Sequence, residues 1–256
     1  MNLTKKFRFQ QKDRQTERKI TAIHEKLADN MKEIEQLFSD TPDLIIRFLQ
    51  IRQSKKEAAI VYISSINDSK AIYEHIISPL LFYDNDEKNE HFIVPFARMK
   101  TVDNWQDVCK AILNGECLLF INDVKIAYVF ETQDFPKRAI EDTPIESSIT
   151  GSHVGFTESA NDNIALLRKQ IHDRQLKMKQ LTVGKRGKTS VTILYLADVA
   201  HPELLNEIIR RMKNIDIDNV MNSGELAEYI EDHPFSPFPQ LLLTERPDFA
   251  AHEILQ

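Results

Sequence analysis

The sequence predicts an α/β fold made of two similar lobes, each a small sheet flanked by helices, joined by an extended linker and a long helix. Helix and strand signals alternate along 256 residues, a length that allows a large buried core. Ten prolines, six glycines and 42% apolar residues argue against disorder over most of the chain. A segment near residue 60 is also similar in sequence to a segment near residue 193, which indicates two related units.

The first lobe is expected at residues 36–134, after a basic arm and helix at residues 1–35. An apolar stripe with spacings of three and four predicts a helix over residues 20–38. Further along, we expect a segment turning from helix to strand at 44–49, a β-branched strand at 58–63, a helix at 105–115, and strands at 117–121 and 125–130.

The repeat supports a second lobe at residues 184–256. Residues 60–66 match residues 193–199 at an offset of 133, and each copy has the order strand, turn, helix. The helix at 105–115 has a counterpart that begins at Asp248, but the strand after it has none within the sequence. We therefore expect the second lobe to be truncated at its C-terminus and the polypeptide to continue with that strand.

Residues 135–183 are expected to connect the lobes. The first part carries Pro136, Pro144, Gly151 and Gly155 among isolated apolar residues, which favours an extended surface linker. A long joining helix is predicted over residues 160–181, because its apolar residues share one face and Thr157 or Ser159 precedes it as a cap.

A proline-rich run lies near the C-terminal end. Pro234, Pro237 and Pro239 exclude a helix and favour an extended chain. The apolar triplet at residues 241–243 follows, and we expect it to form a short buried strand.

Charge, cysteine content and hydropathy indicate which partners and which cellular environment the chain can have. Residues 1–20 hold seven Lys/Arg against two Asp/Glu, and residues 168–188 hold eight Lys/Arg against Asp173 alone. We interpret both as solvated, with an anionic lipid surface or a partner as the alternative; nucleic acid is not expected, because no aromatic residues are interleaved. Cys109 and Cys117 are expected to be free, buried thiols. No run approaches the roughly 18 apolar residues of a membrane span, so the domain is expected to be soluble.

No motif predicts catalysis, a metal or a cofactor. The glycines of residues 184–190 are too close together for a phosphate-binding loop, and a strand follows them where a helix is needed. The segment at 84–86 lacks the glycine and glutamate of a calcium loop, and the histidines show no zinc spacing. Residues 151–155 hold a histidine where a nucleophile elbow needs serine. We therefore expect no enzyme.

Five polar residues are candidates for a site between the lobes. Glu158, Asn163 and Arg168 lie at the start of the joining helix, and Glu245 and Arg246 follow the proline-rich run. We favour inter-domain salt bridges for them; the alternative is an anionic or zwitterionic ligand held between the lobes.

A set of scattered signatures resembles the A subunits of the GerA-type nutrient germinant receptors of bacterial spores. These are Leu37-Phe38 with Asp43 and Arg47, residues 146–168 including Gly155-Phe156-Thr157-Glu158, Gly184-Lys185-Arg186, Tyr195, Asp216-Ile217-Asp218, Ser223-Gly224, and the run from Pro234 to Asp248. Residues 152–154 depart from the family pattern, and the sporulation-stage paralogues of the A subunit share much of it.

The resemblance implies a hydrophilic N-terminal domain that precedes transmembrane helices in the spore inner membrane, on the spore core side. It implies B and C subunits and other A subunits as partners, and a role in nutrient sensing and ion release. On that basis we expect a regulatory and assembly domain. The alternative is a domain that binds an amino acid, sugar or ion between its lobes.

Overall fold

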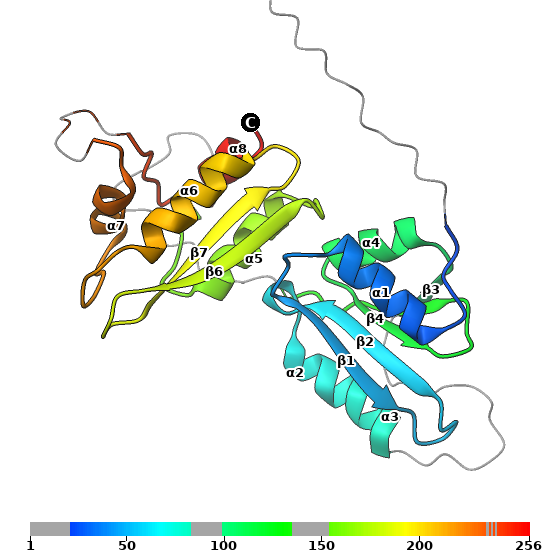
Figure 1. Cartoon of the computed structure of the whole chain (residues 1–256). Helices are drawn as coiled ribbons and strands as arrows, with labels where there is room; N and C mark the ends of the chain where they lie inside the picture. Colours follow the sequence, from blue (N-terminus) through cyan, green and yellow to red (C-terminus); the bar gives the residue numbers. More distant parts are fainter. Residues whose placement is uncertain (1–20, 83–98, 135–153, 234–235, 237, 239) are drawn as a thin grey trace, which may run out of the picture.

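The computed structural model describes residues 21–82, 99–134, 154–233, 236, 238 and 240–256, which form two lobes side by side (Figure 1). Each lobe has its own sheet flanked by helices, so the α/β class and the two-lobed arrangement are confirmed. The expectations for residues 1–20, 84–86 and 135–153, and for the three prolines of the C-terminal run, lie outside the described residues.

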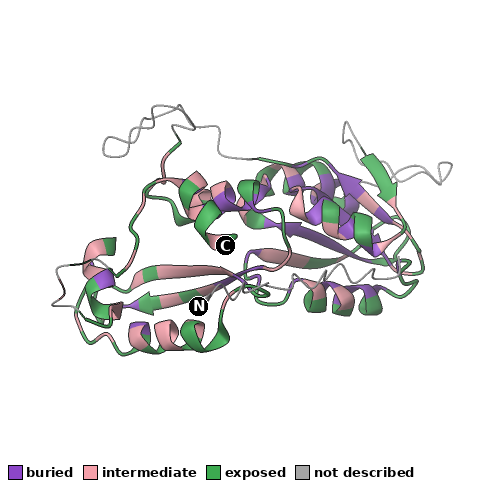
Figure 2. Cartoon of the chain, turned by 90° about the horizontal axis from the view of Figure 1, so that it is seen from above, coloured by how far each residue is buried: buried purple, intermediate pink, exposed green. Residues whose placement is uncertain are grey.

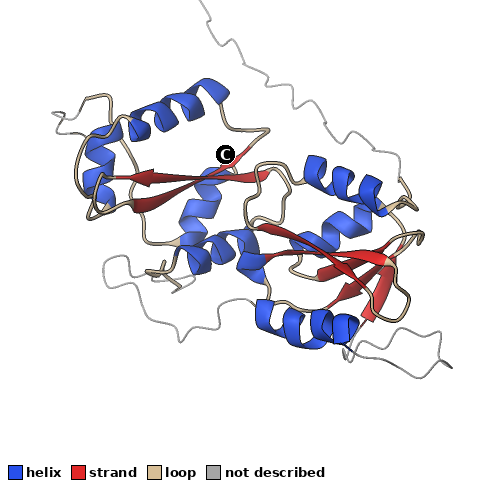
Figure 3. Cartoon of the chain, turned by 60° about the horizontal axis from the view of Figure 1, so that its bottom comes forward, coloured by secondary structure: helices blue, strands red, loops and turns tan. Residues whose placement is uncertain are grey.

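The first lobe is an antiparallel five-stranded sheet with helices on both faces (Figure 3). Its strands are β1 (Leu44–Gln50), β2 (Glu57–Ile63), β3 (Met99–Val102), β4 (Cys117–Ile121) and β5 (Ala127–Phe130), in the order β1-β2-β4-β5-β3. The helical segments are α1 (Leu27–Leu37), η1 (Ser64–Ile66), α2 (Ser69–Ile72), the π-helical turn η2 (Tyr73–Ile77), α3 (Ser78–Phe82) and α4 (Trp105–Leu113). All strand pairs are antiparallel.

Strand β2 lies at the centre of this lobe's core. It pairs with β1 on one edge and with β4 on the other, and every residue from Ala58 to Ile63 is buried. Because side chains alternate along a strand, Val61 packs toward α1 and α4, whereas Ile60 packs toward α2 and α3. Coverage on both faces explains why β2 has no charged residue from Ala58 to Ile63.

Local signals set most element boundaries of the first lobe. The side chain of Asn104 accepts a hydrogen bond from the N–H of Asp107 (2.9 Å) and caps α4, and Gly115 at φ 78° follows the end of α4. The helix and strand predicted at 105–121 are therefore confirmed. Helix α1 begins at Leu27, whose N–H donates to Asn122 Oδ1 (3.0 Å), so the predicted start near residue 20 was too early.

The segment at 44–49 is a strand throughout and not a helix turning into a strand. Its residues pair with β2 without interruption, from Leu44 opposite Ile63 to Gln50 opposite Glu57. Pairing with β2, a contact that the pattern of residues 44–49 does not show, decides the conformation here.

The second lobe is built on a two-stranded hairpin. Its elements are α5 (Ala160–Gln170), β6 (Leu176–Val183), β7 (Thr189–Leu196), α6 (Pro202–Lys213), α7 (Ser223–Ile230) and α8 (Pro247–Ile254). Leu167 and Ile171 pack with Leu176, Leu196 and Ala251, so α5 and α8 cover one face of the hairpin. Helix α6 lies across the other face (Figure 3).

The predicted joining helix over residues 160–181 is wrong in its second half. Helix α5 ends at Gln170, and residues 176–183 form β6. The turn at residues 184–188, with Gly184 at φ 90°, brings β7 back against β6, and this pairing overrides a spacing that also fits a helix. Helix α5 therefore packs as a part of the second lobe.

The strand predicted at residues 241–243 is also wrong. The structure assigns no strand there, and Leu242 and Leu243 are 64% and 53% exposed. The two-stranded sheet of this lobe consists of β6 and β7 alone among the described residues, so no neighbouring strand pairs with the triplet.

The cysteines are free thiols, as expected, with Cys117 buried and Cys109 half-buried. Burial raises the pKa of the Cys117 thiol far above its ordinary value. Within the described ranges, no helix is long and apolar enough to cross a bilayer.

Candidate functional site

The junction between the lobes contains a buried ion pair. Arg168 on α5 donates from Nε to Asp43 Oδ2 (2.8 Å) and from Nη2 to Asp43 Oδ1 (2.7 Å). The two side chains are only 4% and 8% exposed. Ser65 Oγ also donates to Asp43 Oδ2 (2.7 Å), so the carboxylate is held from both lobes. A two-point pair of this kind fixes orientation as well as distance.

Local structure places Asp43 at the edge of the first lobe. The residue immediately precedes β1, and its carbonyl accepts the backbone N–H of Ser64 (2.8 Å) at the start of η1. Helix α5 packs against η1, and its Ala165 is buried in the core of the first lobe. Helix α5 therefore contacts both lobes, and Arg168 projects from the part that crosses between them.

A second set of polar groups links β6 to the end of α1. The N–H of Met178 donates to the carbonyl of Asp40 (3.0 Å), whose backbone is left-handed at φ 51°. Next to it, burial lowers the pKa of Lys177, an effect that Asp40 opposes. Burial and the Asp40 carboxylate raise the pKa of Tyr195. The junction thus combines three buried charged side chains, Asp43, Arg168 and Lys177, with the exposed carboxylate of Asp40. A buried charge is costly unless it is paired.

A groove of about 930 Å³ lies beside this junction, with walls from both lobes. The first lobe contributes Glu35 and Asp40 from the end of α1 and the chain after it. The second contributes Lys179 from β6 and Lys213 from α6. Apolar side chains of β1 and β6 lie between these charges. The groove is therefore lined by charged side chains of both signs and by apolar side chains.

The five candidate residues from the sequence do not converge on this groove, and none of them is among its described lining residues. Asn163 holds the chain before α5, since its side chain exchanges two hydrogen bonds of 2.7 Å with the backbone of Thr157. The carbonyl of Glu245 accepts the N–H of Phe156 (2.8 Å). Arg246 pairs with Asp248 (2.6 Å), and Glu158 is exposed. Only Arg168 reaches the ion pair at the junction.

Sequence reasoning missed Asp40, Asp43 and Lys177 as members of the junction. Asp43 was already present among the residues that carry the family resemblance, so it offered a usable signal. Asp40 and Lys177 offered none, because β6 was expected to be helical and its contact with the first lobe depends on the hairpin.

The basic turn at residues 184–188 is paired with an acidic turn. The N–H of Lys185 donates to the carbonyl of Ile217 (2.8 Å), and those of Arg186 and Gly187 donate to the carbonyl of Asp218 (2.9 and 2.8 Å). The Lys185 side chain also pairs with Asp216. Backbone N–H groups that are used in this way are not available to cradle a phosphate, which agrees with the exclusion of a nucleotide loop.

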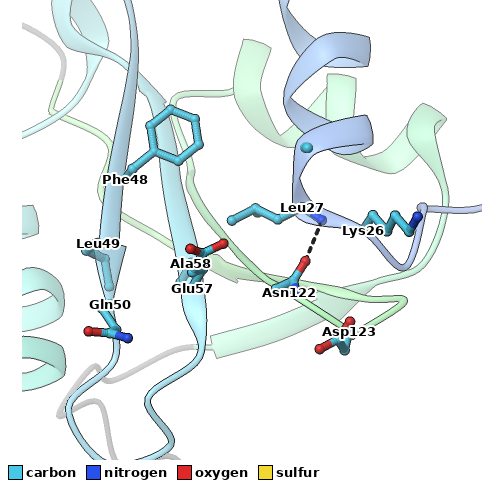
Figure 4. Close-up of a pocket in the computed structure, with 10 residues that line it drawn as sticks. Lys26, Leu27, Phe48, Leu49, Gln50, Glu57, Ala58, Asn122 and Asp123 are labelled. Carbon is cyan, nitrogen blue, oxygen red and sulfur yellow. Dashed lines mark hydrogen bonds between the residues drawn. The ribbon is translucent and has the colours of Figure 1, made fainter.

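A second hollow, of about 760 Å³, lies within the first lobe (Figure 4). It opens between the start of α1 and the far ends of β1 and β2, beside Phe48, Gln50, Glu57 and Asp123. Phe48 is 65% exposed there. The hollow has no concentration of perturbed or buried charged groups, so we regard the junction as the stronger candidate.

The fold and the junction define a two-lobed, hydrophilic domain with polar contacts between its lobes. A family model described as Bacillus/Clostridium GerA spore germination protein matches residues 32–256. The chain therefore belongs to the GerA spore germination family, as the sequence resemblance indicated.

Known relatives agree with this assignment. The chain is 29% identical over 238 residues to spore germination protein GerLA of Bacillus cereus, a match covering 90% of this chain and 48% of the relative. It is 30% identical over 242 residues to spore germination protein KA of Bacillus subtilis, covering 91% and 44%. The chain thus spans about half the length of the curated relatives it matches.

A solved structure has the same fold. The N-terminal domain of the A subunit of the Bacillus megaterium spore germinant receptor GerK3 superposes with a TM-score of 0.69 at 29% identity, covering 93% of this chain and 91% of that domain.

Proposed function

We propose that this chain is the regulatory and assembly domain of a nutrient germinant receptor A subunit, and that it acts in triggering spore germination. The observation that carries the proposal is the buried Asp43–Arg168 ion pair at the junction of the lobes, where helix α5 adds a small apolar contact through Ala165. Directional polar bonds at such a junction favour a small number of discrete lobe arrangements. Relative movement of the lobes is then a route for a signal.

We further propose that the domain acts within a receptor complex at the spore inner membrane. Its partners are the B and C subunits of the receptor and other A subunits. The complete polypeptide is held in the spore inner membrane by a transmembrane region, with this domain on the spore core side. The family description and the matching receptor domain from Bacillus megaterium support this setting. The role proposed is signalling and not catalysis.

Germination of spores that carry junction variants tests the proposal. Asp43→Asn removes the charge at nearly constant shape and should slow nutrient-triggered loss of optical density and ion release when strains with equal amounts of the protein are compared. Glu74→Gln is the matched control, since Glu74 pairs with Lys70 only on the exposed surface at 3.9 Å. A wild-type germination rate for Asp43→Asn at equal protein level would refute a signalling role for the junction.

A second candidate function is small-molecule binding in the groove between the lobes. The observation that favours it is the presence of two acidic and two basic side chains, contributed by opposite lobes, around one groove. A thermal-shift panel of amino acids, sugars and monovalent ions tests it. A ligand at 100 times its Kd should stabilise the chain by about 2.7 kcal/mol. The double variant Lys179→Met/Lys213→Met should lose that shift; a shift that persists unchanged in it would place the ligand elsewhere.

A further inference from the structure

The internal repeat extends over far more of the chain than the strand that first revealed it. Adding 133 to the bounds of α1 (27–37) gives residues 160–170, the bounds of α5. The same shift carries β1 to 177–183, within β6, carries β2 to 190–196, within β7, and carries the start of α2 to Pro202, where α6 begins. Both lobes therefore start with the same unit of helix, hairpin and helix.

Side-chain directions in β2 and β7 agree with this equivalence, whereas those of β6 are reversed relative to β1. In β2, Val61 faces α1 and α4; its counterpart Leu194 in β7 packs in the cluster formed by α5 and α8. Helix α8 therefore takes the place of α4. The pairing of β6 with β7 is shifted by one residue from that of β1 with β2, because the turn of the second hairpin has five residues and that of the first has six.

The two copies differ at one edge of the sheet. In the first lobe, β4 pairs antiparallel with β2 along residues 58–61. The equivalent edge of β7, residues 191–194, has no strand beside it among the described residues. The consequence is visible in the burial: β2 is buried from residue 58 to residue 63, whereas residues 191–195 of β7 are only half-buried (Figure 2).

The amino-acid composition of β7 is typical of a strand in the interior of a sheet. Residues 189–196 contain no charge and no proline, the features with which natural edge strands avoid unwanted pairing. Helices α5 and α8 cover one face of β7 and α6 covers the other (Figure 3). A strand added beside β7 would lie between these helix layers, so it must be apolar on both faces, as β4 is.

We propose that the free edge of β7 is a docking site for an extended, uncharged, apolar β-strand, antiparallel to β7 along residues 191–194. The repeat identifies the source of this strand. In the first lobe β4 follows α4 after three residues, so the strand for the second lobe follows α8 in the same polypeptide. Main-chain hydrogen bonds to β7 supply the affinity, and the two helix layers select apolar side chains.

A grafted strand tests the docking site directly. Asn114 caps the end of α4 as Leu255 caps the end of α8, so Gln256 corresponds to Gly115. A copy of residues 116–123 is therefore joined after Gln256. We expect the extended chain to show about tenfold slower amide exchange at residues 191–194 and a higher Tm than the 256-residue chain. The control is the same extension with prolines in place of its copies of Leu118 and Phe120, which cannot complete the ladder.

The outcomes separate the alternatives. Equal exchange rates and Tm for the graft and its proline control would overturn the docking site. A concentration-dependent dimer of the unextended chain with β7 amides protected at its interface would instead assign this edge to a second copy. In the gene, an uncharged apolar run should follow α8 within roughly 2–6 residues. A charged or proline-rich sequence there would overturn the proposed source.

Discussion

Replacing Asp43 by asparagine should lower the free energy of unfolding more than removal of a surface charge does. The substitution removes the negative charge but almost no volume, and it leaves the Arg168 guanidinium buried and uncompensated. Two charge-assisted hydrogen bonds of 2.7 and 2.8 Å are affected, each worth about 1.5–3 kcal/mol. Breaking a buried pair from one side costs about 3–5 kcal/mol, which is our expected loss in the free energy of unfolding.

Urea unfolding with two probes measures this loss. Trp105, the single tryptophan, is 5% exposed in the core of the first lobe, so its fluorescence follows that lobe. Far-ultraviolet circular dichroism follows both lobes. If the pair couples the lobes, the two transitions coincide in the wild type and separate in Asp43→Asn.

Two further variants make the test decisive. The exposed-pair control Glu74→Gln should cost no more than about 1 kcal/mol. The double variant Asp43→Leu/Arg168→Met replaces the pair by apolar side chains and should recover most of the stability, since buried pairs are often no better than an apolar contact. A loss below about 1 kcal/mol for Asp43→Asn would refute the view that this ion pair holds the junction.

Three other predictions follow from single sites. Gly184→Ala should lower the free energy of unfolding in urea by about 1–3 kcal/mol, because φ is 90° and the new Cβ would lie 3.0 Å from a backbone carbonyl oxygen. The control is Gly224→Ala, which lies inside a helix and should lower the free energy of unfolding by less. Hydrogen bonds from Arg210 and Arg211 hold the pKa of Glu207 at about 2, below its ordinary 4.5. These ion pairs therefore stabilise the folded chain above about pH 4.5, and the stabilisation is lost as the pH falls through about 2. If the stability of Glu207→Gln changed with pH between 4.5 and 2 in the same way as that of the wild type, the prediction would be wrong. Cys117 should resist a thiol reagent at pH 8 in the folded chain while Cys109 reacts first, and equal rates would show that the sheet opens readily.

Local sequence signals predicted many of the helices and strands and the family. The helix that ends in Gly115 and the apolar strand at residues 117–121 could be predicted, because the glycine and the apolar run act within a few residues. The strand repeated at an offset of 133 was sufficient to predict two related lobes. The first inference depends on neighbouring residues, and the second on the similarity of two short segments, so neither requires knowledge of a tertiary contact.

Tertiary structure decided what lies between distant residues. The apolar spacing of residues 171–181 fits a helix or a strand, and only pairing with β7 selects the strand. Likewise, no local pattern joins Asp43 to Arg168, which lie 125 residues apart. Their pairing depends on the packing of α5 against the first lobe, which buries both charges and makes each one require the other. The spacing of apolar residues indicates which face of a helix or strand is buried, and the tertiary structure determines which residues that face contacts.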